Sequence, residues 1–148
     1  MSVRRTALIV AAITCGAEVV NAQTVRISGS VTLHAWTPIS GSAPTVVSDA
    51  TSTYRLGNTD GSNSYKLTAR LSSAMPTGTT LTLAAEASSG ATSVGTVTLD
   101  ATTRDIVTGI INPSSGWRTL TYTLSATSNA GVVSQQTRSV TITFIASP

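Results

Sequence analysis

The chain has 148 residues and a net charge of +3, and only 10% of its residues are charged while 41% are hydrophobic. One domain of ordinary size accounts for this length. Beyond Arg4 and Arg5 the basic residues are scattered singly instead of clustering with aromatic residues, so we expect no nucleic-acid partner.

The N-terminal segment has the three zones of an export signal. Arg4 and Arg5 form a basic start, an apolar run extends from Ala7 to Ile13, and small residues end the segment at Val20-Asn21-Ala22. We predict cleavage between Ala22 and Gln23, which leaves residues 23–148 as a single domain exported to the periplasm or the cell surface.

The apolar run is much shorter than the roughly 20 residues that a membrane-spanning helix needs. A permanent span is therefore disfavoured. Two alternatives stay open: an uncleaved leader that holds the domain at a membrane, and lipid attachment at Cys15. We expect contact with a membrane only if the leader is retained.

Cys15 is the only cysteine, and cleavage would remove it with the leader. The mature domain would then have neither a disulfide nor a thiolate metal site, so packing alone would stabilise it. The single histidine cannot complete a zinc site. We expect no metal and no cofactor.

The mature chain begins with a pattern typical of β-structure. Residues 25–35 carry apolar side chains on one parity and mostly polar ones on the other, which predicts one half-buried strand. A second run over residues 45–56 ends in the turn-forming segment 57–63, and residues 65–72 alternate again. These last two runs predict a hairpin.

Short alternating runs continue to the C-terminus, separated by segments rich in glycine, proline, serine and asparagine. They cover residues 80–87, 94–99, 104–111, 119–126 and 139–145. No segment outside the leader has convincing helical periodicity. We therefore predict an all-β fold, an immunoglobulin-like β-sandwich of seven to eight antiparallel strands. A closed barrel stays open as an alternative, because alternation alone fits both.

Candidate catalytic groups are few. His34 shares the polar parity of residues 25–35, where a solvated side chain is the expected role. No serine lies in a Gly-x-Ser-x-Gly setting. Each carboxylate that a glycosidase-type acid pair would need has the setting of a surface charge; these are Asp49, Asp60, Glu86, Asp100 and Asp105. We assign no catalytic residue and expect a protein that is not an enzyme.

Two features hint at binding. Residues 58–63 place oxygen-bearing side chains around Gly61 as a calcium loop does, but Asp60 is their only carboxylate, so an Asp-Gly turn is the preferred interpretation. Trp36 and Trp117 lie at predicted strand ends, where either could anchor a protein interface or offer a stacking surface to a sugar. A core position is the commoner use of a tryptophan in a sandwich.

The C-terminal half contains four segments with a recognisable pattern: Asp105–Ile110, Leu120–Thr127, Ala130–Val133 and Arg138–Phe144. In these segments the chain resembles a group of small secreted bacterial proteins without an assigned activity. The resemblance covers roughly residues 64–144 and implies a β-sandwich and nothing catalytic.

A looser similarity, in size, leader, threonine content and final strand, links the chain to fimbrial and spore-coat-type subunits. Those subunits polymerise when one lends a strand to the next. The chain departs from the pilin pattern in lacking a cysteine pair after the leader and an aromatic penultimate residue.

Threonine-rich faces with few charges leave sheet edges poorly protected against further strand pairing. Together with export and the missing catalytic groups, this predicts a non-catalytic structural or accessory subunit. Its partners would be other protein subunits, either copies of itself in a surface filament or a larger periplasmic assembly. A carbohydrate-binding module that uses Trp36 or Trp117 is the alternative.

Overall fold

The computed structural model of the protein describes residues 7–13, 23–35, 44–57, 61–113, 115–130 and 133–147. This part of the chain consists of β-strands, their connections and one 3-10 turn, and it contains no α-helix. The all-β prediction is confirmed. In chain order the elements are β1 (Ala7–Ile13), β2 (Thr24–Ser28), β3 (Val31–Ala35), β4 (Val47–Gly57), β5 (Tyr65–Leu71), β6 (Thr79–Ala85), β7 (Thr92–Ser93), β8 (Thr96–Thr98), β9 (Arg104–Ile110), β10 (Arg118–Ala126), η1 (Ser128–Ala130) and β11 (Gln136–Ala146).

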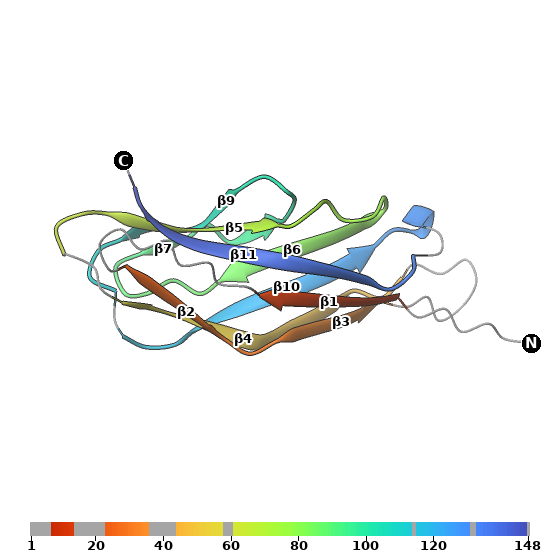
Figure 1. The fold of residues 1–148 in the computed structure, drawn as a ribbon, viewed down its shortest axis with the longest axis horizontal. Helices are drawn as coiled ribbons and strands as arrows, with labels where there is room; N and C mark the ends of the chain where they lie inside the picture. The colour runs from red at the N-terminus through yellow and green to blue at the C-terminus, as the bar shows by residue number, and fades with distance from the viewer. Residues whose placement is uncertain are drawn as a thin grey trace, which may run out of the picture.

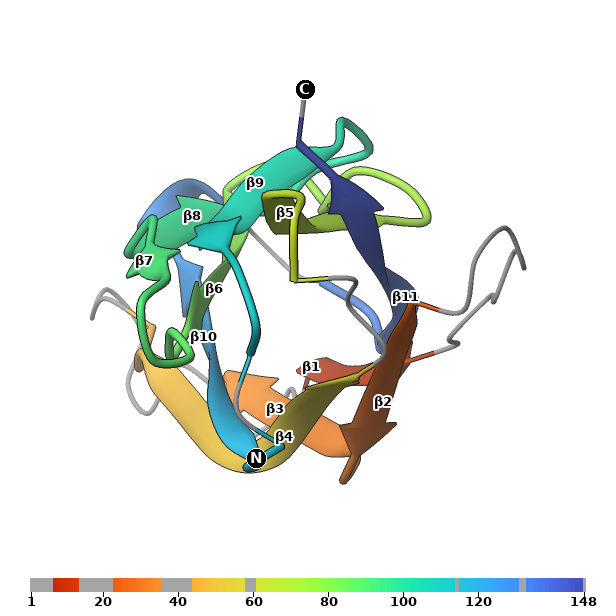
Figure 2. The ribbon, with the colours of Figure 1, turned by 90° about the vertical axis from the view of Figure 1, so that its left-hand side faces the viewer.

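The strands form two sheets (Figure 1). The β11 sheet has the order β3-β1-β11-β5-β9-β7, and the β10 sheet has the order β2-β4-β10-β6-β8. Every pairing is antiparallel except that of β1 with β11. Viewed along the long axis, β5 and β9 lie on one side of the interior and β4 on the other (Figure 2). This arrangement is consistent with a β-sandwich. The described residues contain eleven strands, and ten of them lie in residues 23–148, for which seven to eight were predicted.

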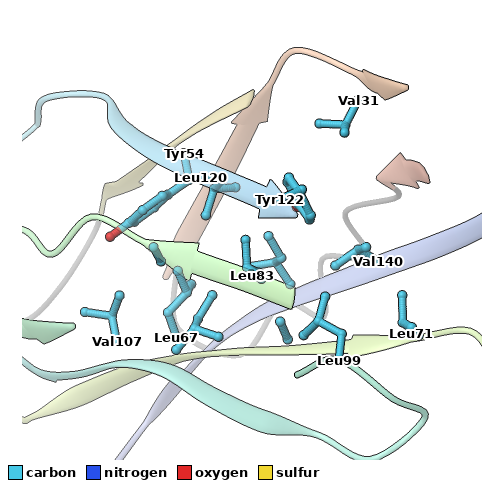
Figure 3. Close-up of a cluster of buried hydrophobic side chains, with 14 of the residues drawn as sticks. Val31, Tyr54, Leu67, Leu71, Leu83, Leu99, Val107, Leu120, Tyr122 and Val140 are labelled. Atoms are coloured by element: carbon cyan, nitrogen blue, oxygen red, sulfur yellow. The ribbon is translucent and has the colours of Figure 1, made fainter. Parts of the chain in front are cut away.

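The core fills the space between the sheets (Figure 3). Alternation brings one face of each long strand inward, and the buried residues form a single cluster. Its largest fully buried members come from both sheets: Tyr54, Tyr122, Leu33, Leu67, Leu71, Leu81, Leu83, Ile106, Ile110, Leu120, Leu124 and Ile142. The predicted inward parity of β5, β6, β10 and β11 is confirmed. Thr68 departs from it, because this outward position is also buried and its hydroxyl donates to the Thr143 carbonyl at 3.4 Å.

The predicted hairpin over residues 45–72 is wrong. β4 lies in the β10 sheet and β5 in the β11 sheet, so the chain crosses between sheets after Gly57 instead of folding back on itself. The physical reason is that turn-forming residues allow a reversal without fixing which strands pair. β4 pairs with β2 and β10, whereas β5 pairs with β9 and β11.

The predicted single strand over residues 25–35 is also wrong in one respect. Its inward parity holds, but the chain breaks at Gly29 and the two halves, β2 and β3, join different sheets. Gly29 has a φ of 93°, and a Cβ there would lie 2.9 Å from the Thr51 carbonyl oxygen. Only glycine suits this backbone at such a close approach.

Two buried tyrosines of the β10 sheet differ in how their hydroxyl groups are satisfied. Tyr54 donates to the Glu86 carbonyl at 2.5 Å. The buried Tyr122 hydroxyl has no hydrogen-bond partner among the described residues. Burial raises the pKa of both tyrosines. The pKa of Tyr54 rises to about 12; the nearby charge of Arg118 lowers it in part, and that of Glu86 raises it further.

Replacing each tyrosine by phenylalanine should separate these two settings. Tyr54→Phe leaves the Glu86 carbonyl without its donor, so we expect the free energy of unfolding to fall by about 1–2 kcal/mol. Tyr122→Phe removes an unsatisfied buried polar group, so the free energy of unfolding should stay within about 0.5 kcal/mol of the parent or rise. Urea denaturation of both variants measures this, and equal losses would contradict the assignment.

Alkaline pH should destabilise the domain through the same residues. In the unfolded chain both tyrosines ionise near pH 10, whereas the folded domain retains their protons until higher pH. The stabilising contribution is therefore complete below pH 10 and is lost as the pH rises, by about 1.4 kcal/mol per pH unit for each tyrosine. Between pH 10 and 12 the free energy of unfolding of the Tyr122→Phe variant should fall less steeply than that of the parent protein. An unchanged slope would contradict the raised pKa of Tyr122.

Candidate functional site

The apolar run of the predicted leader lies inside a sheet. Residues Ala7–Ile13 form β1, with β3 on one side and β11 on the other. The chain direction of β1 is parallel to β11 and antiparallel to β3. We call this place between β3 and β11 the β1 position (Figure 1). The segment that we predict to be part of a cleaved leader thus supplies an inner strand of the sheet.

The register matches alternate residues of β1 with core-facing residues of its neighbours. Ile9 pairs with Leu33 and Ala11 with Val31 on β3, and Ile13 pairs with Val140 on β11. Leu33, Val31 and Val140 are all buried. Without a strand at the β1 position, the facing backbone groups of β3 and of Gln136–Val140 would form two unpaired edges.

β11 also has a free stretch of edge. β1 pairs with Gln136–Val140 only, whereas β5 pairs with Val140–Ala146 along the opposite edge. Among the described residues, no strand pairs with the β1-side edge beyond Val140. Ile145, which is 38% exposed, lies in this stretch. Uncharged, partly apolar edges of this kind are templates for pairing with another strand.

A second feature lies on the outer face of the β10 sheet. Arg26 of β2 is directly opposite Arg55 of β4; Arg26 alternates with the partly buried Val25 and Ile27, and Arg55 alternates with the buried Tyr54 and Leu56. The Arg55 guanidinium lies over the Trp117 ring, with its Cζ 5.5 Å from the ring centroid. Trp117 is 46% exposed. Its predicted use as a binding surface is therefore compatible with its position, whereas a core position is excluded.

A hollow of about 270 Å³ adjoins the two arginines. Gly57 is outward-facing there, and a Cβ on it would lie 3.1 Å from the Thr24 hydroxyl oxygen, so the missing side chain helps to keep the hollow open. The hollow is lined by Thr24, Arg26, Arg55, Leu56, Gly57 and Ser115.

The described carboxylates are each engaged locally. Asp49 accepts hydrogen bonds from the backbone and hydroxyl of Thr51. Asp105 forms an ion pair with Lys66 at 3.1 Å. The structure does not gather these groups into an acid pair, and Asp60 lies outside the described residues.

The other two carboxylates have lowered pKa values. The Thr119 backbone N–H, which donates to the Glu86 carboxylate at 3.0 Å, is the main cause of the lowered pKa of Glu86. Arg104, which donates to Asp100 at 2.6 Å, is the main cause of the lowered pKa of Asp100. Both shifts stabilise the ionised form, which is the opposite of what a general acid at neutral pH needs.

His34 is exposed on the outward parity of β3, as the sequence predicts. Within the described residues, no group of three or more His, Cys, Asp or Glu side chains could hold a metal ion. No described helix is long and apolar enough to cross a membrane.

Several predicted positions lie outside the described residues. These are Trp36, Ala22 on one side of the predicted cleavage site, and residues 58–60 of the possible calcium loop. Gln23, on the other side of the cleavage site, directly precedes β2.

Sequence reasoning missed the opposed arginines. Both fall on the polar parity of their runs, which is the only sequence signal for them. Their juxtaposition depends on the pairing of β2 with β4, which alternation does not specify.

No protein-family model, no curated protein and no solved structure matches this chain.

Proposed function

We propose that this protein is an exported, non-catalytic structural or accessory subunit that joins other protein subunits through the β1 position. The observation that carries the proposal is the place of residues 7–13 between β3 and β11. Cleavage after Ala22 would separate this strand from the mature domain. A strand of another subunit would then pair with the two exposed edges.

Two forms of assembly fit this proposal. Identical subunits could form a surface filament, which the loose similarity to fimbrial and spore-coat-type subunits supports. A single module could instead dock on a larger periplasmic assembly. If the leader stays attached, the domain is held at the membrane, which favours docking beside a membrane complex.

We further infer that the sandwich is immunoglobulin-like. In support, the N-terminal part of the mature chain contributes β2 to one sheet and β3 to the other, and long strands from distant parts of the chain pair in both sheets. The non-catalytic role is supported by the local engagement of the described carboxylates and the exposed position of His34.

Cutting the full chain tests the proposal. A protease site introduced within residues 16–21 allows the folded protein to be purified whole and then severed between β1 and β2. We expect the cut chain to self-associate or to take up a labelled peptide of residues 6–14, because a strand there pairs with two open edges. Size-exclusion chromatography and fluorescence anisotropy measure the two outcomes.

The matched control is the same peptide with Val10→Pro. Proline cannot donate at an inner strand position. Its uptake should be at least about tenfold weaker, since leaving a buried backbone group unsatisfied costs about 1–3 kcal/mol. The uncut chain should neither self-associate nor take up peptide. A cut chain that remains monomeric and binds neither peptide would contradict the proposal.

A further inference from the structure

A row of three side chains crosses the outer face of the β10 sheet at one end. Arg26 and Arg55 are cross-strand partners, and Arg118 pairs with Tyr54 in the next register step. Trp117 directly precedes Arg118, which places it beside Arg55, in agreement with the cation–π distance of 5.5 Å. The row therefore consists of Arg26, Arg55 and Trp117.

The arginine pair places two like charges at directly opposite positions of neighbouring strands. Directly opposite residues of antiparallel strands have Cβ atoms about 4.5–5.5 Å apart, and like charges there are destabilising. The ion pairs among the described residues join Lys66 to Asp105, Arg104 to Asp100 and Arg118 to Glu86. None of them includes Arg26 or Arg55. An external anion between the two guanidinium groups would remove their repulsion.

The volume and the lining of the hollow beside the arginine pair indicate what kind of molecule could carry that anion. Its volume of about 270 Å³ is near the lower end for small-ligand sites, ~300 Å³. Thr24 and Ser115, which carry hydroxyl groups, are among its lining residues, and the lack of a side chain at Gly57 keeps it accessible. Trp117 adds an exposed aromatic ring at its side.

We propose that this hollow binds an anionic sugar unit of a polysaccharide. Its carboxylate or sulfate lies between Arg26 and Arg55, because guanidinium groups bind such oxyanions with paired, charge-assisted hydrogen bonds. Its hydroxyl groups face Thr24 and Ser115, and the sugar ring lies toward Trp117. This site is on the β10 sheet and does not use the β1 position, so it is independent of strand-mediated assembly.

Binding of the full chain to four polymers tests the proposal. Polygalacturonate and dextran sulfate offer the two anionic groups on a sugar, dextran offers sugar without charge, and polyglutamate offers carboxylates without sugar. We expect binding to at least one anionic polysaccharide, weakened by salt, and much weaker binding to dextran and polyglutamate. The first two polymers distinguish a carboxylate from a sulfate as the bound group.

Substitutions at the row should remove this binding. Arg26→Gln with Arg55→Gln should weaken it at least about tenfold, and Trp117→Ala at least about fivefold. Arg70→Gln is the control for a general loss of positive charge, because it removes one arginine charge from an exposed position on the β11 sheet and should change binding less than about twofold.

Arg26→Glu separates binding from folding. It replaces the like-charge pair with an opposite-charge pair, so the melting temperature should hold or rise while binding to the anionic polysaccharide is lost. No binding to either anionic polysaccharide, equal binding to polyglutamate, or equal losses from Arg70→Gln and the row variants would each overturn the proposal.

Discussion

An inner strand of a sheet needs hydrogen-bonding partners along both edges, and the β11 sheet meets this requirement with a segment that the sequence marks as a leader. β1 joins β3 to β11. If it leaves, the backbone edges of β3 and β11 that bear the buried residues Val31, Leu33 and Val140 lose their partner together. If the leader is cleaved as proposed, export and assembly would be coupled, because the cut that frees the domain would also open the place where a new strand would bind.

The chain has one cysteine and can form no internal disulfide, so packing holds the rest of the domain together. Long strands in both sheets bury alternate side chains in one cluster, and the core residues Leu83, Leu120 and Tyr122 lie on β6 and β10, which pair with each other away from the β1 position. The opposed arginines belong to this same β10 sheet, on its outer face. The two proposed surfaces therefore lie on different sheets, so a subunit could be held in an assembly while its arginine pair stays accessible to a ligand.

The sequence predicts local features well and pairings poorly, for one physical reason. The period of two decides which side chains face inward, so the buried faces of β5, β6, β10 and β11 and the exposed position of His34 follow from the residues alone. Partner choice depends on contacts between distant segments. The turn-forming residues after Gly57 suit a crossing between sheets as well as a hairpin, and the break at Gly29 depends on the close approach of Thr51. The sequence does not reveal the arginine pair, for the same reason. The aliphatic run of β1 is equally typical of a leader and of a strand.

Hydrogen exchange of the full chain before and after cleavage between Ala22 and Gln23 tests the central claim most directly. The account predicts that amides of β3 and of Gln136–Val140 lose protection on cleavage, that an added strand peptide restores it, and that β6 and β10 stay protected throughout. Unchanged protection of β3 and β11 after the leader has departed, or an equal loss across the whole domain, would contradict it.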